Sequence, residues 1–156
     1  TPVDFPGKGK VHAGFYYALS GDCWRHILEV LDRPENKAKS LWISGHSLGA
    51  ALAMVAAAHL KPAGLYNFGS PRVGDAAFCA SLANVNFYRF VNCSDVVTQV
   101  PLKDLLGFQH GGTLQYFDAP ASLYTQPSKT FTERDRLKAQ WLYPLQVWPV
   151  PLLSDK

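Results

Sequence analysis

A serine stands at the centre of the sequence Gly45-His46-Ser47-Leu48-Gly49, which fits the pattern Gly-x-Ser-x-Gly. A serine hydroxyl attacks a carbonyl carbon when a neighbouring imidazole takes its proton and an acid holds that imidazole in the correct tautomer. In one large class of folds such a serine occupies a sharp turn between a strand and a helix. The pattern alone is weak, because two glycines around a serine also punctuate ordinary strand–turn–helix units.

The residues on both sides of this pentapeptide have the composition that such a turn requires. Residues 41–43 form a short apolar run with strand character, and residues 50–60 are almost wholly strong helix formers. We therefore interpret Ser47 as a nucleophile on a strand-to-helix turn, with its backbone in a strained conformation. Gly45 and Gly49 lack a Cβ, and we expect both to let the strand pack closely against the helix.

The helix that follows Ser47 is expected to supply part of the catalytic apparatus. Free N–H groups and the positive dipole end favour a developing oxyanion at a helix N-terminus. The backbone N–H of Leu48, the residue after Ser47, is then one oxyanion donor. Apolar residues at i, i+3, i+4 and i+7 predict one helix face turned toward a sheet: Leu48, Ala51, Leu52 and Val55.

Asp95 is the candidate for the acid. When the serine stands on a strand-to-helix turn, the chain order is serine, acid, histidine, with the acid on a loop after a later strand. Residues 86–92 alternate and are rich in aromatics, which predicts a strand, and Asp95 follows them. The alternative is that Asp95 only caps the end of that strand. Asp75, which resembles a helix cap, and Asp104, in a predicted loop, are weaker candidates.

The base is harder to assign. Chain order requires a histidine after Asp95, and His110 is the one that qualifies, since no histidine occurs from 111 to 156. His110 lies in a glycine-rich stretch before a predicted strand. His46 is beside Ser47, but adjacent positions on such a turn are expected to point apart. On the residues alone, either His110 is the base or the given sequence lacks one.

The elements around these residues indicate an α/β fold with a mainly parallel sheet, because strands alternate with helices. The 156 residues fit one domain, spanning 1–156. Further elements are predicted as strands at 64–69 and 113–118, a mostly helical region from 11 to Pro34, helices at 76–82 and 131–143, and loops at 1–10 and 119–128. The tail is broken by prolines from 144 onward.

Composition argues against several other classes of protein. Apolar residues make up 47% of the chain and charged residues 17%, as in a globular protein. The net charge of +3 is small and the cations are scattered, so nucleic acid is not an expected partner. No apolar run is long enough to cross a bilayer. The three cysteines match no metal site, and we expect them to be free and buried; they favour neither a secreted nor a cytoplasmic location.

Together these motifs resemble the class 3 lipases, the family of the fungal triacylglycerol lipases and their bacterial relatives. The segments that carry the resemblance follow the family's order and spacing: 10–15, 43–53, 66–75, 88–97 and 108–117. The resemblance implies an α/β-hydrolase fold and a serine hydrolase that cleaves acylglycerols or related lipid esters through an acyl-enzyme on Ser47. It makes Asp95 the triad acid and the Leu48 N–H an oxyanion donor. It also implies a lipid ester partner, met at a lipid–water interface, and no metal or cofactor.

The sequence departs from the family pattern at both ends. Family members carry an earlier strand whose Arg-Gly-Thr-like motif supplies a second oxyanion donor, and nothing before Val11 matches it. The family's catalytic histidine lies well downstream of the acid, while the histidine matching His110 is usually structural. We therefore expect an incomplete hydrolase domain. The alternative functions are a non-catalytic module that binds lipid or protein, and hydrolysis of amides or thioesters on the same turn.

Overall fold

The computed structural model describes residues 1–101 and 107–142. Its centre is a five-stranded sheet in the order β3-β4-β5-β6-β7. The first four strands are parallel and the last is antiparallel: β3 (Trp42–His46), β4 (Gly64–Phe68), β5 (Asn86–Asn92), β6 (Thr113–Phe117) and β7 (Leu123–Thr125). The predicted α/β fold with a mainly parallel sheet is confirmed.

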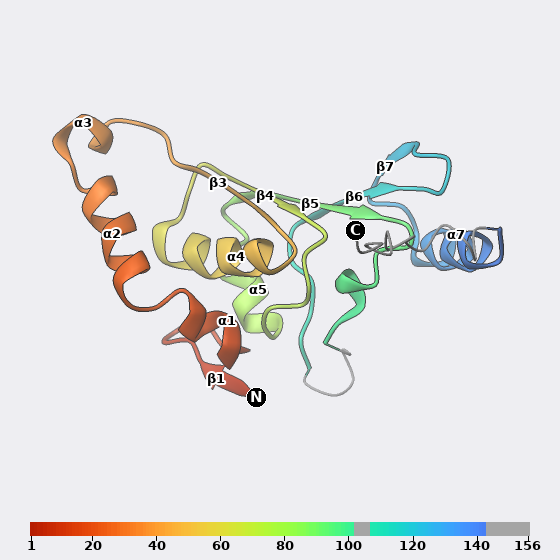
Figure 1. Cartoon of the computed structure of the whole chain (residues 1–156), viewed down its shortest axis with the longest axis horizontal. Coiled ribbons are helices and arrows are strands. Elements are labelled where there is room, and N and C mark those ends of the chain that lie inside the picture. Colours follow the sequence, from red (N-terminus) through yellow and green to blue (C-terminus); the bar gives the residue numbers. More distant parts are fainter. Residues whose placement is uncertain (102–106, 143–156) are drawn as a thin grey trace, which may run out of the picture.

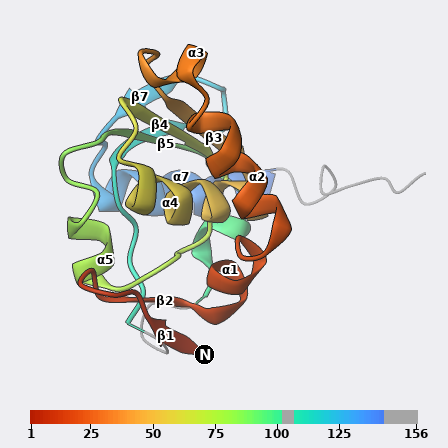
Figure 2. The same cartoon turned by 90° about the vertical axis from the view of Figure 1, so that its left-hand side faces the viewer.

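Helices cover one side of this sheet. In both views α4 (Leu48–Leu60), α5 (Ala76–Ala80) and α7 (Lys129–Leu142) lie on the same side of the strands (Figures 1 and 2). None of the described helices lies over the opposite face (Figure 1). Strand residues that alternate with the core residues Ile43, Leu65 and Phe87 form rows of stacked aromatic rings on that face. The rows are Trp42–Tyr66–Tyr88 and Phe68–Phe90–Phe117. The parallel register brings these rings together, because it places Tyr66 beside Tyr88 and Phe68 beside Phe90.

Helix α4 is buried on more sides than its sequence spacing predicts. It contacts the sheet on one side and α1 (Ala13–Ala18) on another, so nearly all of its residues from Ala50 to Ala58 are buried. Small alanine side chains allow this close approach from two directions. The single predicted face is therefore wrong in part: Ala51 and Val55 are buried, whereas Leu48 is 54% exposed at the N-terminal end of the helix.

The first residues form a hairpin, where a loop and the start of a helix were predicted. Strand β1 (Pro2–Asp4) pairs antiparallel with β2 (Lys10–His12), and Val3 lies opposite Val11. Val11 is completely buried and Phe5 is 3% exposed, so the hairpin packs against the hydrophobic core through these side chains. Short strands of this kind are stabilised by tertiary packing, which local composition does not reveal.

Helices continue after the hairpin with α2 (Asp22–Leu31) and α3 (Pro34–Lys37). Pro34 begins a helix here, whereas it was expected only to end one, because proline fits the first helical position, where no N–H partner is needed. Strand β7 replaces part of the loop predicted at 119–128, because it pairs with β6 along Gln115, Tyr116 and Phe117. The strands predicted at 64–69, 86–92 and 113–118 are confirmed.

All three cysteines are free, as expected, but they are not all buried. Cys93 is buried and Cys79 half-buried, whereas Cys23 is exposed because it lies on the outer surface of α2. Among the described helices none combines the length and the hydrophobicity needed to cross a membrane. Asp104 and the proline-broken tail from 144 onward lie outside the described residues.

Candidate active site

Ser47 connects the end of β3 to the start of α4, as the pattern predicts. Its φ is 53° and its ψ is −121°, a backbone conformation that L-residues rarely adopt. The Ser47 N–H donates to the carbonyl oxygen of Phe68 at 2.9 Å, which ties the turn to the end of the neighbouring strand. The strained backbone conformation is therefore at Ser47 itself, the residue between the strand and the helix. The expectation of a strained turn is confirmed.

The two glycines of the motif have different environments. A Cβ on Gly45 would overlap the carbonyl group of Gly49 and stand 2.6 Å from the Ala50 nitrogen, so the strand passes the helix with no room for a side chain. A Cβ on Gly49 would meet nothing within 4 Å. The close approach predicted for both glycines thus depends on Gly45 alone. Gly49 is exposed in the first turn of the helix, although its carbonyl group lies against the strand.

Leu48 begins α4, and its N–H lies in the first helical turn, where no carbonyl four residues earlier belongs to the helix. The helix N-terminus therefore presents a donor beside Ser47. The exposed Leu48 side chain leaves this end of the helix open to a ligand.

Asp95 follows β5 on a tight loop, at the carboxyl end of the parallel strands, where α/β proteins commonly bind ligands. Its Oδ1 accepts the N–H of Val97 at 2.9 Å, and its own N–H donates to the Asn92 carbonyl at 3.0 Å. The Thr98 hydroxyl donates to the Asp95 carbonyl at 2.8 Å. These bonds fix the backbone of the loop and one oxygen of the carboxylate, while Oδ2 faces Gly69.

The fold brings Ser47 and Asp95 to one cavity of about 350 Å³. Its other walls are His46, Gly69, Asn92, Ser94 and Val97. Within the described residues, Ser47 and Asp95 share this cavity without a direct hydrogen bond to each other.

His46 lies on the wall of this cavity beside Ser47. Its Nε2 is 3.6 Å from the position that a Cβ on Gly69 would occupy. Both residues therefore contribute to the wall of one cavity, while the expectation that their side chains point apart stays a prediction.

His110 does not reach the cavity walls. Its Nε2–H donates to the Thr98 carbonyl at 2.7 Å, so this nitrogen is already used. Burial, reinforced by the positive charge of Arg89, lowers the pKa of His110 to about 3. The imidazole is therefore neutral near pH 7 and a weak base.

The loop that carries Asp95 is also held from the side of β4. Arg72 donates from Nη1 to the carbonyls of Gln99 and Pro101, the latter at 2.9 Å, and its N–H donates to the Val100 carbonyl at 2.8 Å. Asp75 is the N-cap of α5, where its carboxylate accepts the Phe78 N–H at 2.8 Å. That structural role confirms its interpretation as a helix cap.

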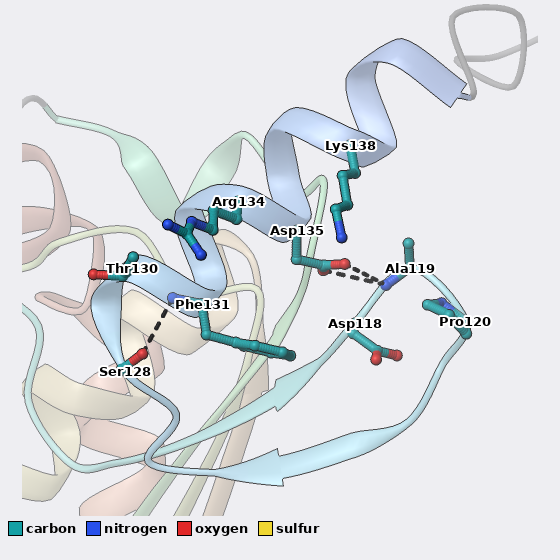
Figure 3. A pocket seen from close by; sticks show the side chains of 9 residues that line it. All are labelled: Asp118, Ala119, Pro120, Ser128, Thr130, Phe131, Arg134, Asp135 and Lys138. Carbon is teal, nitrogen blue, oxygen red and sulfur yellow. Dashed lines mark hydrogen bonds between the residues drawn. The ribbon is translucent and has the colours of Figure 1, made fainter.

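A second, larger cavity of about 530 Å³ lies between α7 and the β6–β7 turn (Figure 3). Its polar groups serve the structure: Asp135 accepts the Tyr116 hydroxyl at 2.9 Å and the Ala119 N–H at 3.2 Å, while Ser128 accepts the Phe131 N–H at 3.2 Å. Neither Ser47 nor Asp95 lines it. The size of a cavity therefore does not identify the site, because the candidate residues Ser47 and Asp95 line the smaller of these two cavities.

Sequence reasoning assigned no role to Gly69, which forms part of the cavity wall next to Asp95. A signal was present, since a glycine at the end of a predicted strand and directly before Ser70-Pro71 indicates a special backbone position. What that glycine faces could not be inferred, because Asp95 lies on a different strand end.

Comparisons with known proteins agree with this geometry. Residues 1–105 match the family described as Lipase (class 3). The chain is 37% identical over 105 residues to secreted mono- and diacylglycerol lipase A of Penicillium cyclopium, covering 64% of this chain and 33% of that protein. It is 35% identical over 110 residues to Toxin TseL of Vibrio cholerae, covering 65% of this chain and 16% of the toxin.

A solved structure gives the same result for the fold. The lipase from Rhizopus microsporus var. chinensis superposes with a TM-score of 0.69 at 30% identity, over 82% of this chain and 50% of that one. The chain thus spans a half or less of the length of each of these three proteins. The family match covers the hairpin, the Ser47 turn and the Asp95 loop. The chain therefore belongs to the class 3 lipase family and has its α/β-hydrolase fold.

Proposed function

We propose that this domain carries the nucleophile and the acid of a serine carboxylic ester hydrolase that cleaves acylglycerols or related lipid esters. The observation that carries the proposal is the shared cavity, in which the strained Ser47 and the loop residue Asp95 face the same space. Relatives named as mono- and diacylglycerol lipases support the substrate class.

In this mechanism the Ser47 hydroxyl attacks the ester carbonyl carbon and its proton passes to an imidazole base. The carbonyl oxygen becomes an oxyanion that accepts the Leu48 N–H at the start of α4. Collapse of the tetrahedral intermediate expels the alcohol, which takes the proton from the imidazolium, and leaves the acyl group on Ser47. Water then attacks the acyl-enzyme, with the same base, and releases the carboxylic acid. Asp95 orients the imidazole and stabilises its charge.

The base in this proposal is the histidine that the family places downstream of the acid. Of the two histidines discussed, His110 is a poor candidate, because its Nε2 is occupied and its pKa is about 3. His46 lines the cavity and is the competing imidazole. Its backbone is fixed in β3 next to Ser47, which limits how it could swing between the hydroxyl and the leaving group.

The proposal is tested by labelling the full-length gene product with a fluorophosphonate, with intact mass as the readout. We expect one adduct on the wild-type protein, none on Ser47→Ala, and labelling retained on His46→Asn. Loss of labelling in His46→Asn as complete as in Ser47→Ala would make His46 the base and overturn the downstream assignment. No adduct on the wild-type protein would identify a non-catalytic module that binds lipid or protein.

Matched substrates test the reaction class. An ester, an amide and a thioester that share one acyl chain are compared at equal concentration, and we expect the ester to be cleaved fastest. Preference for the amide or the thioester would keep Ser47 as nucleophile but reject lipid ester hydrolysis, because the same turn supports all three reactions.

A further inference from the structure

We propose that Gly69 is a positioning residue for Asp95: its missing side chain leaves the space that the Asp95 carboxylate occupies at the wall of the Ser47 cavity. The inference rests on the proposed function, since it explains how the acid of that mechanism is placed. It concerns a residue that lines the cavity beside Asp95 but has no side chain of its own.

Gly69 meets two separate demands. Its φ is +57°, in the left-handed region that favours glycine. A Cβ there would also stand 2.6 Å from Asp95 Oδ2, a separation that real Cβ atoms essentially never show. The backbone conformation and the available space therefore both require glycine at this position. The lack of space results from the carboxylate of Asp95 itself.

The backbone of Gly69 cannot retreat easily. Its N–H donates to the Phe90 carbonyl at 3.0 Å, and the residue directly follows β4, whose pairing with β5 is parallel and regular. The neighbouring Ser70 is completely buried. The glycine is thus held on both sides by the sheet and the core.

Asp95 is the part that would move. Its loop is fixed by the Asn92 carbonyl and by the hydroxyl of Thr98, but Oδ2 lies at the end of a side chain that can rotate. Rotation of the Asp95 side chain would break the hydrogen bond that the Val97 N–H donates to Oδ1. A methyl on Gly69 would therefore displace the carboxylate while leaving the fold in place. Displacements of about 1 Å in a catalytic constellation cost up to about a hundredfold in rate.

Gly7 provides a matched control for the conformational part of the effect. It also has a positive φ, of +70°, but a Cβ there would meet nothing within 4 Å. Gly7→Ala introduces backbone strain without a clash and lies in the hairpin turn, away from the cavity. The difference between Gly69→Ala and Gly7→Ala isolates the contact with the carboxylate.

The experiment is a double-mutant cycle on the full-length gene product with a p-nitrophenyl ester. It compares wild type, Gly69→Ala, Asp95→Ala and the double variant, with Gly7→Ala as control, by kcat, KM and thermal unfolding. We expect Gly69→Ala to lower kcat at least about tenfold with KM nearly unchanged. In the Asp95→Ala background the same substitution should cost no further activity, because the displaced group is gone.

The outcomes separate this inference from the proposed function. If Asp95→Ala retains full activity, the acid assignment falls and takes the inference with it. If Asp95→Ala is inactive but Gly69→Ala behaves like Gly7→Ala, or if the losses multiply in the double variant, the role of Gly69 alone is overturned. Should Gly69→Ala fail to fold, recovery of folding in the double variant supports the same contact, and no recovery rejects it.

Discussion

The His110 Nε2–H donates to the Thr98 carbonyl at 2.7 Å, and Thr98 in turn donates its hydroxyl to the Asp95 carbonyl. The histidine that chain order offers as the base is thus a support of the loop that carries Asp95. Because burial disfavours its charged form, the fold holds this imidazole neutral.

The low pKa of His110 predicts an acid-sensitive fold. The pKa falls from 6.5 in the unfolded chain to about 3 in the folded one, so the unfolded state binds more protons between these values. The contribution of His110 to the free energy of unfolding is fully present above pH 6.5 and is lost as the pH falls toward 3. We expect this residue to add up to about 1.4 kcal/mol per pH unit to the slope of the unfolding free energy.

Urea unfolding between pH 4 and 7 measures this slope. His110→Gln should flatten it, whereas His26→Gln, at an exposed position on α2, should leave it unchanged. Slopes that agree for His110→Gln and the wild-type protein would show that His110 is not the titrating group.

Asp95→Asn should abolish most of the activity while preserving the fold. The amide has the size of the carboxylate but cannot hold a protonated imidazole in the same way, and such changes cost about 10⁴-fold in kcat. Asp75→Asn is the matched control, because an asparagine caps a helix as well as an aspartate does. Measurement of kcat on an ester decides between the two; equal losses would reject Asp95 as the acid.

The two glycines of the Ser47 turn should respond oppositely to alanine. Gly45→Ala pushes a methyl into the backbone of Gly49 and should cost at least about 2 kcal/mol, as overpacked sites do. Gly49→Ala meets open space inside a helix and should stabilise the protein by about 0.5–1 kcal/mol. Chemical denaturation gives both values, and a similar cost at the two positions would contradict the described packing.

The cysteines should differ in reactivity. Cys23 is exposed on α2, whereas burial raises the pKa of the Cys79 thiol to about 11 and Cys93 is buried. Iodoacetamide at pH 8 should therefore modify Cys23 first. Peptide mapping by mass spectrometry follows the order, with Cys23→Ser as the control. Early modification of Cys79 in the folded protein would mean that its surroundings are more open than described.

The sequence by itself determined the Ser47 turn, the central strands and the position of Asp95 after β5. These are local features, because a strand, a tight turn and a run of helix-forming residues each depend on residues that are neighbours in the sequence. The alternation of residues 86–92, for example, predicts a strand without reference to any other segment. The family resemblance rests on the same short segments, because each of them is a continuous stretch of the sequence.

The tertiary structure decided which side chains meet. Strands β1 and β7 form because they pair with β2 and β6, and the residues of β1 and β7 do not by themselves predict that pairing. The cavity joins Ser47, His46, Gly69 and Asp95 from three strand ends, and the space beside Oδ2 exists only where those ends converge. Whether His110 could act as a base was likewise a matter of burial and of Thr98. Burial and contacts between distant segments are properties of the packed chain, so only the three-dimensional arrangement could provide them.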